Sequence, residues 1–402
     1  MNKKLLCSII LPTLAAALPL TATADNSPLA AADNGFAFKL LRQLVQDQPA
    51  QDIFISPYSA STVLQMVGNG AAGQTKTEMQ SVLGTAGLTT EDANAANKNI
   101  LESLSQNTNV ILTTANAIWC RAGVSLKPDF LAANRDFFDA TVESIDFTDP
   151  ASVDVINDWA SEKTHGKIPS IADGMIDPDQ TQMFLANAVY FKGKWEDPFD
   201  ASDTKDRPFY LHDGNQKSVP MMTKSKTFTY RHGTGYQAVR LPYLDDNLSM
   251  YVFLPDTNSS PEDLLSILNG DKWRRITKPG FSDRSGTLVL PRFKLNYTAD
   301  LKAPLQNLGI KAAFDRSTAD FSGISQTNLF ISGAVQKTFV EVKEEGTEAA
   351  AVTGIGMVSA GIEMPPQNPF EMIVDHPFLF LIEDNQTGII LFMGVVFNPQ
   401  PN

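Results

Sequence analysis

Apolar positions along the chain repeat with two different periods, and the change between them divides the sequence. A helical spacing of three and four residues runs through 35–44 and 59–68, and shorter runs over 157–163 and 263–268 predict two further helices. Alternating or continuous apolar runs predict strands over 110–120, 181–191, 237–243, 248–254, 287–293, 335–342, 378–383 and 388–397. Because helices come mainly early and strands mainly late, the pattern predicts an α+β fold rather than alternating βαβ units.

Local signals sharpen some of these boundaries. Ser56 and Pro57 supply a hydroxyl cap and a first-turn proline for the second helix. Polar turns over 245–247 and 384–388 each separate two predicted strands and therefore indicate two hairpins. The 402 residues allow two domains by length alone, but no repeat or low-complexity linker divides them.

The first 24 residues are typical of a cleaved signal peptide. Lys3 and Lys4 precede a mostly apolar stretch that prolines interrupt, and Ala22-Thr23-Ala24 offers a small-x-small cleavage site. The sequence therefore predicts an exported protein, secreted or periplasmic, with residues 25–402 as the mature domain. The net charge of −13 becomes more negative by two on cleavage. Such acidity argues against nucleic acid and against anionic membranes as partners.

None of the sequence motifs that we searched for indicates an enzyme active site. The chain has two cysteines, of which Cys120 alone follows the signal, so neither an internal disulfide nor a Cys-rich zinc site is predicted. The four histidines form no H-E-x-x-H pattern, and neither a G-x-S-x-G elbow nor a P-loop occurs. We expect no metal, no cofactor and no enzymatic activity. Cys120 follows apolar residues and is expected to be a buried thiol.

Residues 344–364 combine two properties that rarely occur together. The segment is rich in alanine and glycine, which is typical of an exposed loop that proteases can cut. Its side chains also follow the two-residue period of a strand. If the segment were extended, one face would carry no charge and would consist of Thr347, Ala349, Ala351, Thr353, Ile355 and Met357. Composition alone favours an ordinary surface loop, but the alternation also suits a central strand.

At this point the residues match a known family. Glu344 to Ala351 read EEGTEAAA, which resembles the reactive-centre hinge of inhibitory serpins without a mismatch. Further segments resemble serpin motifs in the family's order: 54–59, 70–75, 157–168, 187–195, 198–204, 241–243, 290–293, 319–324, 375–378, 392–394 and 398–399. The resemblance covers about residues 34–399.

This resemblance implies a single domain with three β-sheets, about nine helices and an exposed reactive-centre loop over about 344–366. It implies an irreversible inhibitor of serine endopeptidases that acts as a monomer and forms a covalent 1:1 complex. The protease cleaves the loop, and the loop then inserts as a strand into the large sheet while the acyl-enzyme is still attached.

The family's functional positions carry over residue by residue. The hinge is Glu344, Glu345, Gly346, Thr347, Glu348, Ala349, Ala350 and Ala351. The shutter, where the sheet opens, corresponds to Ser56, Ser59, Asn187 and Gln336, the last replacing the histidine of many members. The breach, where insertion begins, corresponds to Trp195, Arg292 and Glu344, with an ion pair expected between the last two.

The usual loop length places the reactive bond at Ala360-Gly361, which implies elastase- or subtilisin-like proteases that accept a small apolar residue. The bonds Met357-Val358 and Ser359-Ala360 stay open as alternatives, as do thiol proteases as targets. A non-inhibitory serpin with a binding or chaperone-like role is the main rival function. Residues 92–106 contain a single basic residue, Lys98, so no heparin-type cofactor is expected.

Overall fold

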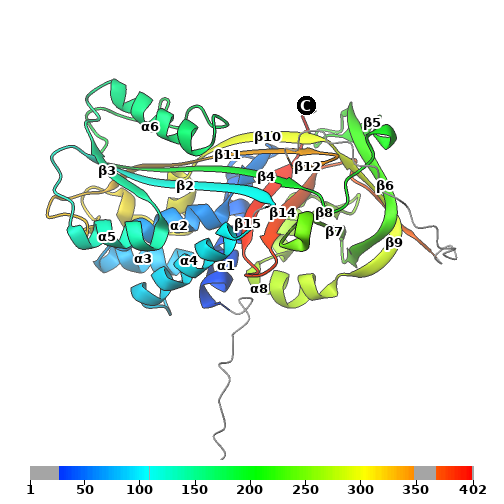
Figure 1. Ribbon diagram of the computed structural model, residues 1–402, viewed down its shortest axis with the longest axis horizontal. Coiled ribbons are helices and arrows are strands. Elements are labelled where there is room, and N and C mark those ends of the chain that lie inside the picture. Colours follow the sequence, from blue (N-terminus) through cyan, green and yellow to red (C-terminus); the bar gives the residue numbers. More distant parts are fainter. Residues whose placement is uncertain (1–26, 108, 348–367, 401–402) are drawn as a thin grey trace, which may run out of the picture.

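The computed structural model describes residues 27–107, 109–347 and 368–400, which form nine α-helices and fifteen strands (Figure 1). The helices are α1 (Pro28–Asp47), α2 (Pro57–Gly68), α3 (Gly73–Leu83), α4 (Thr90–Ser105), α5 (Pro128–Phe138), α6 (Ala151–Lys163), α7 (Pro261–Ile267), α8 (Gly270–Lys272) and α9 (Lys302–Leu308). The strands are β1 (Ile53–Ile55), β2 (Val110–Arg121), β3 (Thr141–Ile145), β4 (Met183–Lys194), β5 (Lys205–Tyr210), β6 (Gln216–Gly233), β7 (Tyr236–Pro242), β8 (Leu248–Pro255), β9 (Ser282–Pro291), β10 (Phe293–Asp300), β11 (Ile331–Lys343), β12 (Gly346–Thr347), β13 (Phe370–Ile373), β14 (Phe378–Asp384) and β15 (Ile390–Val396).

Each predicted helix and strand overlaps an observed element of the same type. The predicted strand over 287–293 is divided, because β9 ends at Pro291 and β10 begins at Phe293. The pattern did not reveal α3, α4, α5, α8 or α9, nor the long strand β6 and the shorter strands β1, β3, β5 and β13. These elements carry many polar residues; α4, for example, buries only Asn94, Asn97 and Ile100. Tertiary contacts, rather than local apolar periodicity, therefore define them.

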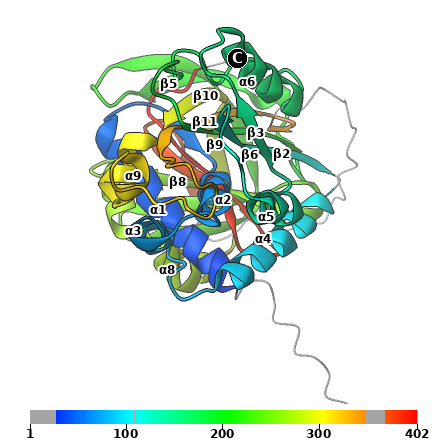
Figure 2. The ribbon, with the colours of Figure 1, turned by 90° about the vertical axis from the view of Figure 1, so that its left-hand side faces the viewer.

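A six-stranded sheet, in the order β10-β11-β12-β4-β2-β3, forms the upper layer of the molecule in Figure 1. Helix α6 covers its outer face, and α1 to α5 lie on the opposite side, where α2 packs directly against β2 and β4 (Figures 1 and 2). The contact below α6 is apolar and includes Trp119, Trp159 and Phe184. Burial on both faces explains why β4 reads as a nearly continuous apolar run.

The other strands form a nine-stranded sheet, in the order β1-β15-β14-β8-β7-β6-β9-β13 with β5 paired to β6. Strand β6 is 18 residues long and pairs with β7, with β9 and with β5. Hydrogen bonding is therefore continuous through β6, and the described strands form two hydrogen-bonded sheets. The three sheets that the resemblance implies are obtained only when the larger sheet is divided at β6.

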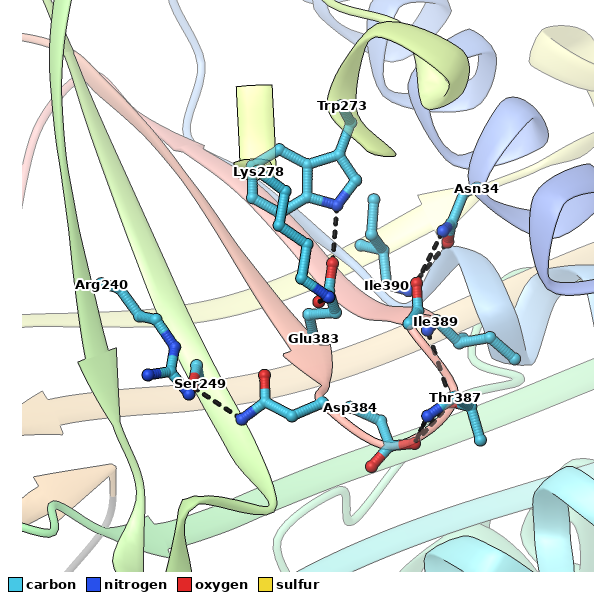
Figure 3. A network of polar contacts seen from close by, with 12 residues as sticks. Asn34, Arg240, Ser249, Trp273, Lys278, Glu383, Asp384, Thr387, Ile389 and Ile390 are labelled. Carbon is cyan, nitrogen blue, oxygen red and sulfur yellow. Dashed lines mark hydrogen bonds and ion pairs between the residues drawn. The ribbon is translucent and has the colours of Figure 1, made fainter. Parts of the chain in front are cut away.

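The hairpin β14–β15 is tied to the helices by buried polar contacts (Figure 3). The Glu383 carboxylate accepts a hydrogen bond of 2.6 Å from the indole of Trp273 and forms an ion pair of 2.6 Å with Lys278. On the other strand, the amide N–H of Ile390 donates to the side-chain oxygen of Asn34 on α1, at 2.9 Å. The Glu383 side chain is fully buried, so both partners are needed to offset the loss of its hydration. The turns at 245–247 and 384–388 join hairpins, as predicted.

Among the described residues, no helix combines the length and the apolar character that crossing a membrane requires. The predicted signal peptide lies outside these residues.

Candidate strand-insertion site

Strand β12 lies between β11 and β4 at one end of the six-stranded sheet (Figure 1). The chain leaves β11, turns at Glu344-Glu345, and returns antiparallel to both neighbours. Gly346 pairs with Lys343 on one side and with Lys194 on the other. Two residues of the predicted hinge therefore already occupy a strand position inside the sheet.

Gly346 is required by this arrangement. Its φ angle is +147°, a conformation that residues with a side chain rarely adopt. A Cβ atom at this position would lie 2.2 Å from the carbonyl oxygen of Gly193. Any side chain here would therefore push β12 away from β4.

Thr347 is fully buried and is held by a hydroxyl pair. Its Oγ1 lies 2.8 Å from the phenol oxygen of Tyr243, which is also fully buried. Burial raises the pKa of Tyr243 well above its ordinary value, so the phenol stays neutral and can share a proton with the threonine. The Tyr243 ring stacks on Trp195, with ring centroids 4.6 Å apart and an interplanar angle of 20°.

Glu344 anchors the turn that precedes β12. Its carboxylate accepts bonds of 2.8 and 2.9 Å from Nε of Arg292, and one of 2.5 Å from the hydroxyl of Thr204. Burial by itself raises the pKa of Glu344, but the hydrogen bonds from Arg292 and Thr204 outweigh it and hold the pKa below its usual range. The carboxylate is therefore charged and fixed at neutral pH.

Trp195 closes the same turn from the β4 side. Its indole N–H donates to the carbonyl of Lys343 at 2.9 Å, and its backbone N–H donates to the carbonyl of Glu345 at 3.0 Å. Trp195, Arg292 and Glu344, which the sequence assigned to one region, therefore lie together around the hinge.

Direct pairing between β4 and β11 stops three residues short of the level of Thr347 in β12. The two strands are parallel and pair from Met183 with Ile331 up to Tyr190 with Phe339. Beyond that pair, the strands separate and Thr347 lies between Gly193 and Val342. Extension of β12 must therefore separate Tyr190 from Phe339 first. We call the Tyr190–Phe339 pair the gate.

The gate is a packed aromatic contact on the outer face of the sheet. The ring centroids of Tyr190 and Phe339 are 6.3 Å apart with an interplanar angle of 38°. The ammonium of Lys167 lies 5.9 Å and that of Lys294 5.4 Å from the centroid of the Phe339 ring. Cations over an aromatic face add to the stability of the closed seam.

Farther along the seam, a buried polar cluster crosses between β4, β11 and α2. Gln336 donates to the carbonyl of Ser56 at 2.8 Å and to the Asn187 side chain at 2.5 Å, and its Oε1 accepts from the Ser56 N–H at 2.9 Å. Asn187 in turn donates to Ser59 at 2.5 Å and to Asn116 at 2.6 Å. All five residues are buried. The seam is thus sealed by hydrogen bonds that strand separation has to break.

Most of the predicted functional residues fall into these two clusters. Ser56, Ser59, Asn187 and Gln336 surround the middle of the seam, and the breach residues surround its end. The hinge residues Glu348, Ala349, Ala350 and Ala351 and the reactive bond Ala360-Gly361 lie outside the described residues.

Sequence reasoning did not assign a role to five residues of the site: Asn116, Thr204, Tyr243, Tyr190 and Phe339. Thr204, Tyr243 and Tyr190 do lie within motifs that had been recognised. Their contacts depend on which strands become neighbours, which no local pattern specifies.

Other candidate chemistry is weak in the described part of the chain. Burial raises the pKa of the Cys120 thiol to about 12, which makes it an unreactive core residue, as predicted. Within residues 27–107, 109–347 and 368–400, no three His, Cys, Asp or Glu side chains are placed to hold a metal ion. The arrangement is instead suited to admitting a further strand between β4 and β11.

Comparison with known proteins gives the same fold over nearly the whole chain. The family model described as Serpin (serine protease inhibitor) matches residues 31–399. Serpin B6 of Pongo abelii is 37% identical over 383 residues, which cover 92% of this chain and 99% of that protein. The leukocyte elastase inhibitor of Sus scrofa is also 37% identical, over 387 residues, with the same coverage of both chains. Among solved structures, the thermophilic serpin Tengpin in its native state superposes with a TM-score of 0.84 at 32% identity, covering 92% of this chain and 94% of that one.

Proposed function

Because this chain belongs to the serpin family, we propose that it is a one-use inhibitor of serine endopeptidases that traps its target by inserting the cleaved loop between β4 and β11. The active-site serine of the protease attacks the carbonyl carbon of Ala360, and the amine of Gly361 leaves. The acyl-enzyme ester then stays attached to the N-terminal part of the loop. Insertion carries the protease away before water can hydrolyse the ester.

The observation that carries this proposal is the position of β12. Its two residues already pair antiparallel with both neighbours, so the inserted strand extends an existing ladder. Extension replaces one parallel interface, between β4 and β11, with two antiparallel ones. Antiparallel pairs are slightly more stable per residue, and the number of interstrand hydrogen bonds increases. The intact loop cannot complete this extension, because its far end is held where the chain enters β13.

The chemistry of the hinge supports inhibition rather than a purely structural role. Thr347 lies in a closed environment that accepts a small hydroxyl side chain, and the predicted inward positions after it are Ala349 and Ala351. A large or charged residue at these positions would have to be buried in the sheet. None is present, which favours rapid insertion.

A small apolar residue at Ala360 favours elastase- and subtilisin-like targets. One relative of 37% identity is named a leukocyte elastase inhibitor, which is consistent with such a preference. We further propose that residues 1–24 are a cleaved signal peptide and that the mature chain acts as a secreted or periplasmic monomer.

The test is incubation of the purified mature protein with pancreatic elastase and, separately, with subtilisin. We expect a 1:1 complex that survives boiling in SDS, and mass spectrometry of the released peptide identifies the cleaved bond. The cleaved protein is also expected to melt at a much higher temperature than the intact one. Clean cleavage without lasting inhibition would overturn the proposal and favour a non-inhibitory binding role. A stable complex with papain, but with neither serine protease, would show that the targets are thiol proteases instead.

A further inference from the structure

Lysine side chains gather on the outer face of the six-stranded sheet, on the half that α6 leaves uncovered (Figure 1). Side chains two residues apart on a strand share a face. Ala188 of β4 and Val335 of β11 pack under α6, so residues at two-residue steps from them also face outward, as do the β10 residues that pair with this row of β11. These outward positions carry four lysines, which we call the lysine face: Lys192 and Lys194 of β4, Lys343 of β11 and Lys294 of β10.

Strand pairing places these lysines around the end of the seam. Lys194 and Lys343 lie on either side of Gly346, because β12 pairs with both of their strands. Lys192 precedes Lys194 by two residues, which is about 7 Å along β4. Lys294 lies on β10, the next strand beyond β11. The backbone positions of the lysine face therefore extend from β4 to β10 over three strand spacings, about 14 Å.

The described neighbours neutralise only part of the charge on the lysine face. Within the described part of the chain, Lys343 alone among the four forms an ion pair, with Glu341 at 3.1 Å. Lys194 and Lys294 are exposed to solvent, and Lys192 is partly exposed. Three ammonium groups besides that of Lys343 can therefore meet an anion from solvent.

A further cation borders the lysine face, although the chain as a whole is acidic. The Lys167 ammonium lies 6.0 Å from the centroid of the Tyr190 ring, on the same side of the sheet. Lys337 is instead occupied, because its ammonium donates to the carbonyl of Ser170 at 2.9 Å. The net charge of the chain is −13, but physiological salt largely screens exposed charges beyond about 8 Å. An anion at this surface therefore responds mainly to the lysines beside it.

We propose that the lysine face binds a linear polyphosphate chain, which crosses the end of the seam from β4 to β10. A lysine ammonium binds phosphate as a compact point charge and requires no bidentate geometry. Polyphosphate carries a charge at every phosphorus with no uncharged spacer, so a short stretch of it can neutralise four lysines within about 14 Å. A sulfated polysaccharide, whose charges are separated by sugar rings, complements so short a surface less well. Binding needs neither loop cleavage nor strand insertion, so this proposal does not depend on protease trapping.

The test uses the intact, uncleaved protein and a short linear polyphosphate with fluorescein at one end, and binding is measured by fluorescence anisotropy. Four neutralised charges predict that affinity falls roughly fiftyfold between 50 and 200 mM salt, on the slope of about 0.7 per charge that single-stranded polyanions show. Unlabelled heparin octasaccharide is the competitor, and at equal charge concentration we expect it to bind at least tenfold more weakly. Acetylation of lysines with and without polyphosphate, followed by mass spectrometry, should show protection of the four lysines of the lysine face.

The double variant Lys194→Glu/Lys294→Glu reverses two exposed charges of the lysine face and is expected to weaken binding at least tenfold. Lys98→Glu/Lys311→Glu is the matched control, because it changes the net charge equally at exposed lysines on α4 and after α9, and it should leave binding unchanged. Absence of binding, equal losses in the two variants, protection of other lysines, or tighter binding of heparin would each overturn the proposal. The acetylation experiment uses the wild-type chain, so it decides the matter even if the first variant fails to fold.

Discussion

Replacing Phe339 with alanine should speed loop insertion, although it removes a buried aromatic ring. Phe339 and Tyr190 are the last directly paired residues of β11 and β4 below β12. An inserted strand places these two strands about 9.6 Å apart, twice the ordinary spacing, so the ring contact cannot persist. The contact therefore stabilises only the resting state, and its loss lowers the barrier to insertion.

The magnitude follows from the contacts that the gate makes. An aromatic pair contributes roughly 0.5–1.5 kcal/mol beyond burial. The exposed Lys167, 5.9 Å from the Phe339 ring, adds about 0.5 kcal/mol, whereas Lys294 lies on β10, which stays beside β11, so its contact persists. The total is about 1.5 kcal/mol, which corresponds to a rate increase of roughly tenfold if the transition state has lost the whole contact. The packing of Phe339 within β11 and against β10 persists after insertion. Its loss in the variant therefore raises the free energies of the resting and inserted states by similar amounts and changes the insertion rate little.

The assay is quenched-flow mixing of the inhibitor with excess subtilisin, followed by SDS electrophoresis. The rate at which stable complex forms from acyl-enzyme reports insertion. Phe228→Ala is the matched control, because Lys226 lies 5.2 Å from the Phe228 ring and Phe370 packs edge-on to it at 5.9 Å, both away from the seam. Both variants should unfold at a lower temperature, but only Phe339→Ala should insert faster.

An unchanged or slower insertion rate in Phe339→Ala, with a stability loss similar to that of Phe228→Ala, would refute the role of the gate. The Phe339 ring would then contribute only to the stability of the fold, and the barrier to loop insertion would arise from other contacts between β4 and β11.

Three further predictions concern buried groups near the seam and in the helical layer. Thr347→Arg forces a cation into the site beside Tyr243, so insertion should slow at least a hundredfold and subtilisin should cleave the variant as a substrate. Gln336 does not titrate, so insertion should show no inflection from this site between pH 5 and 8. Gln336→His should introduce one near pH 6.5, because a protonated imidazole cannot accept from the Ser56 N–H. Burial raises the pKa of Asp33 to about 7, so stability should fall as pH rises from about 4 to 7, and Asp33→Asn should raise it by up to about 4 kcal/mol at pH 8.

Each of these predictions has a direct readout. Titration of subtilisin activity counts the inhibitor molecules consumed per trapped protease, and an unchanged ratio in Thr347→Arg would show that burial of residue 347 beside Tyr243 is not required for trapping. Thr347→Val is its uncharged control. The rate of complex formation, measured across this pH range, checks Gln336→His. A pH-independent rate in this variant would show that the contact with Ser56 does not contribute to the insertion barrier. Urea unfolding at pH 5 and pH 8 checks Asp33→Asn, and an equal gain at both values would show that burial of charge is not the cause.

The sequence established the ends of several elements through local chemistry. Ser56 caps α2 and Pro57 begins it, as the residue pattern predicted, because the cap and the first turn depend only on neighbours in the chain. The apolar strands were also found, since burial on both faces leaves a continuous apolar run. The hinge was recognised from its own eight residues. In each case, the information lies within one short segment.

The register between distant strands could not be obtained in this way. Tyr190 meets Phe339 across 149 positions of sequence only because β4 and β11 are parallel neighbours. Tyr243 reaches Thr347 for a similar reason, and Asn116 joins the polar cluster because it lies opposite Asn187. A pattern along one strand states which face is buried, but it does not state which partner lies beside it.

Thus the amino-acid sequence by itself determined the fold class, the family and the segment that is suited to act as both loop and strand. Only the tertiary structure decided how far that segment has already entered the sheet, which pair of rings it must separate next, and which lysines come together on the outer face of the sheet. The physical reason is that apolar periodicity is a property of one continuous segment. Hydrogen-bond ladders and ring contacts instead form between segments that are distant in sequence and become neighbours only on folding.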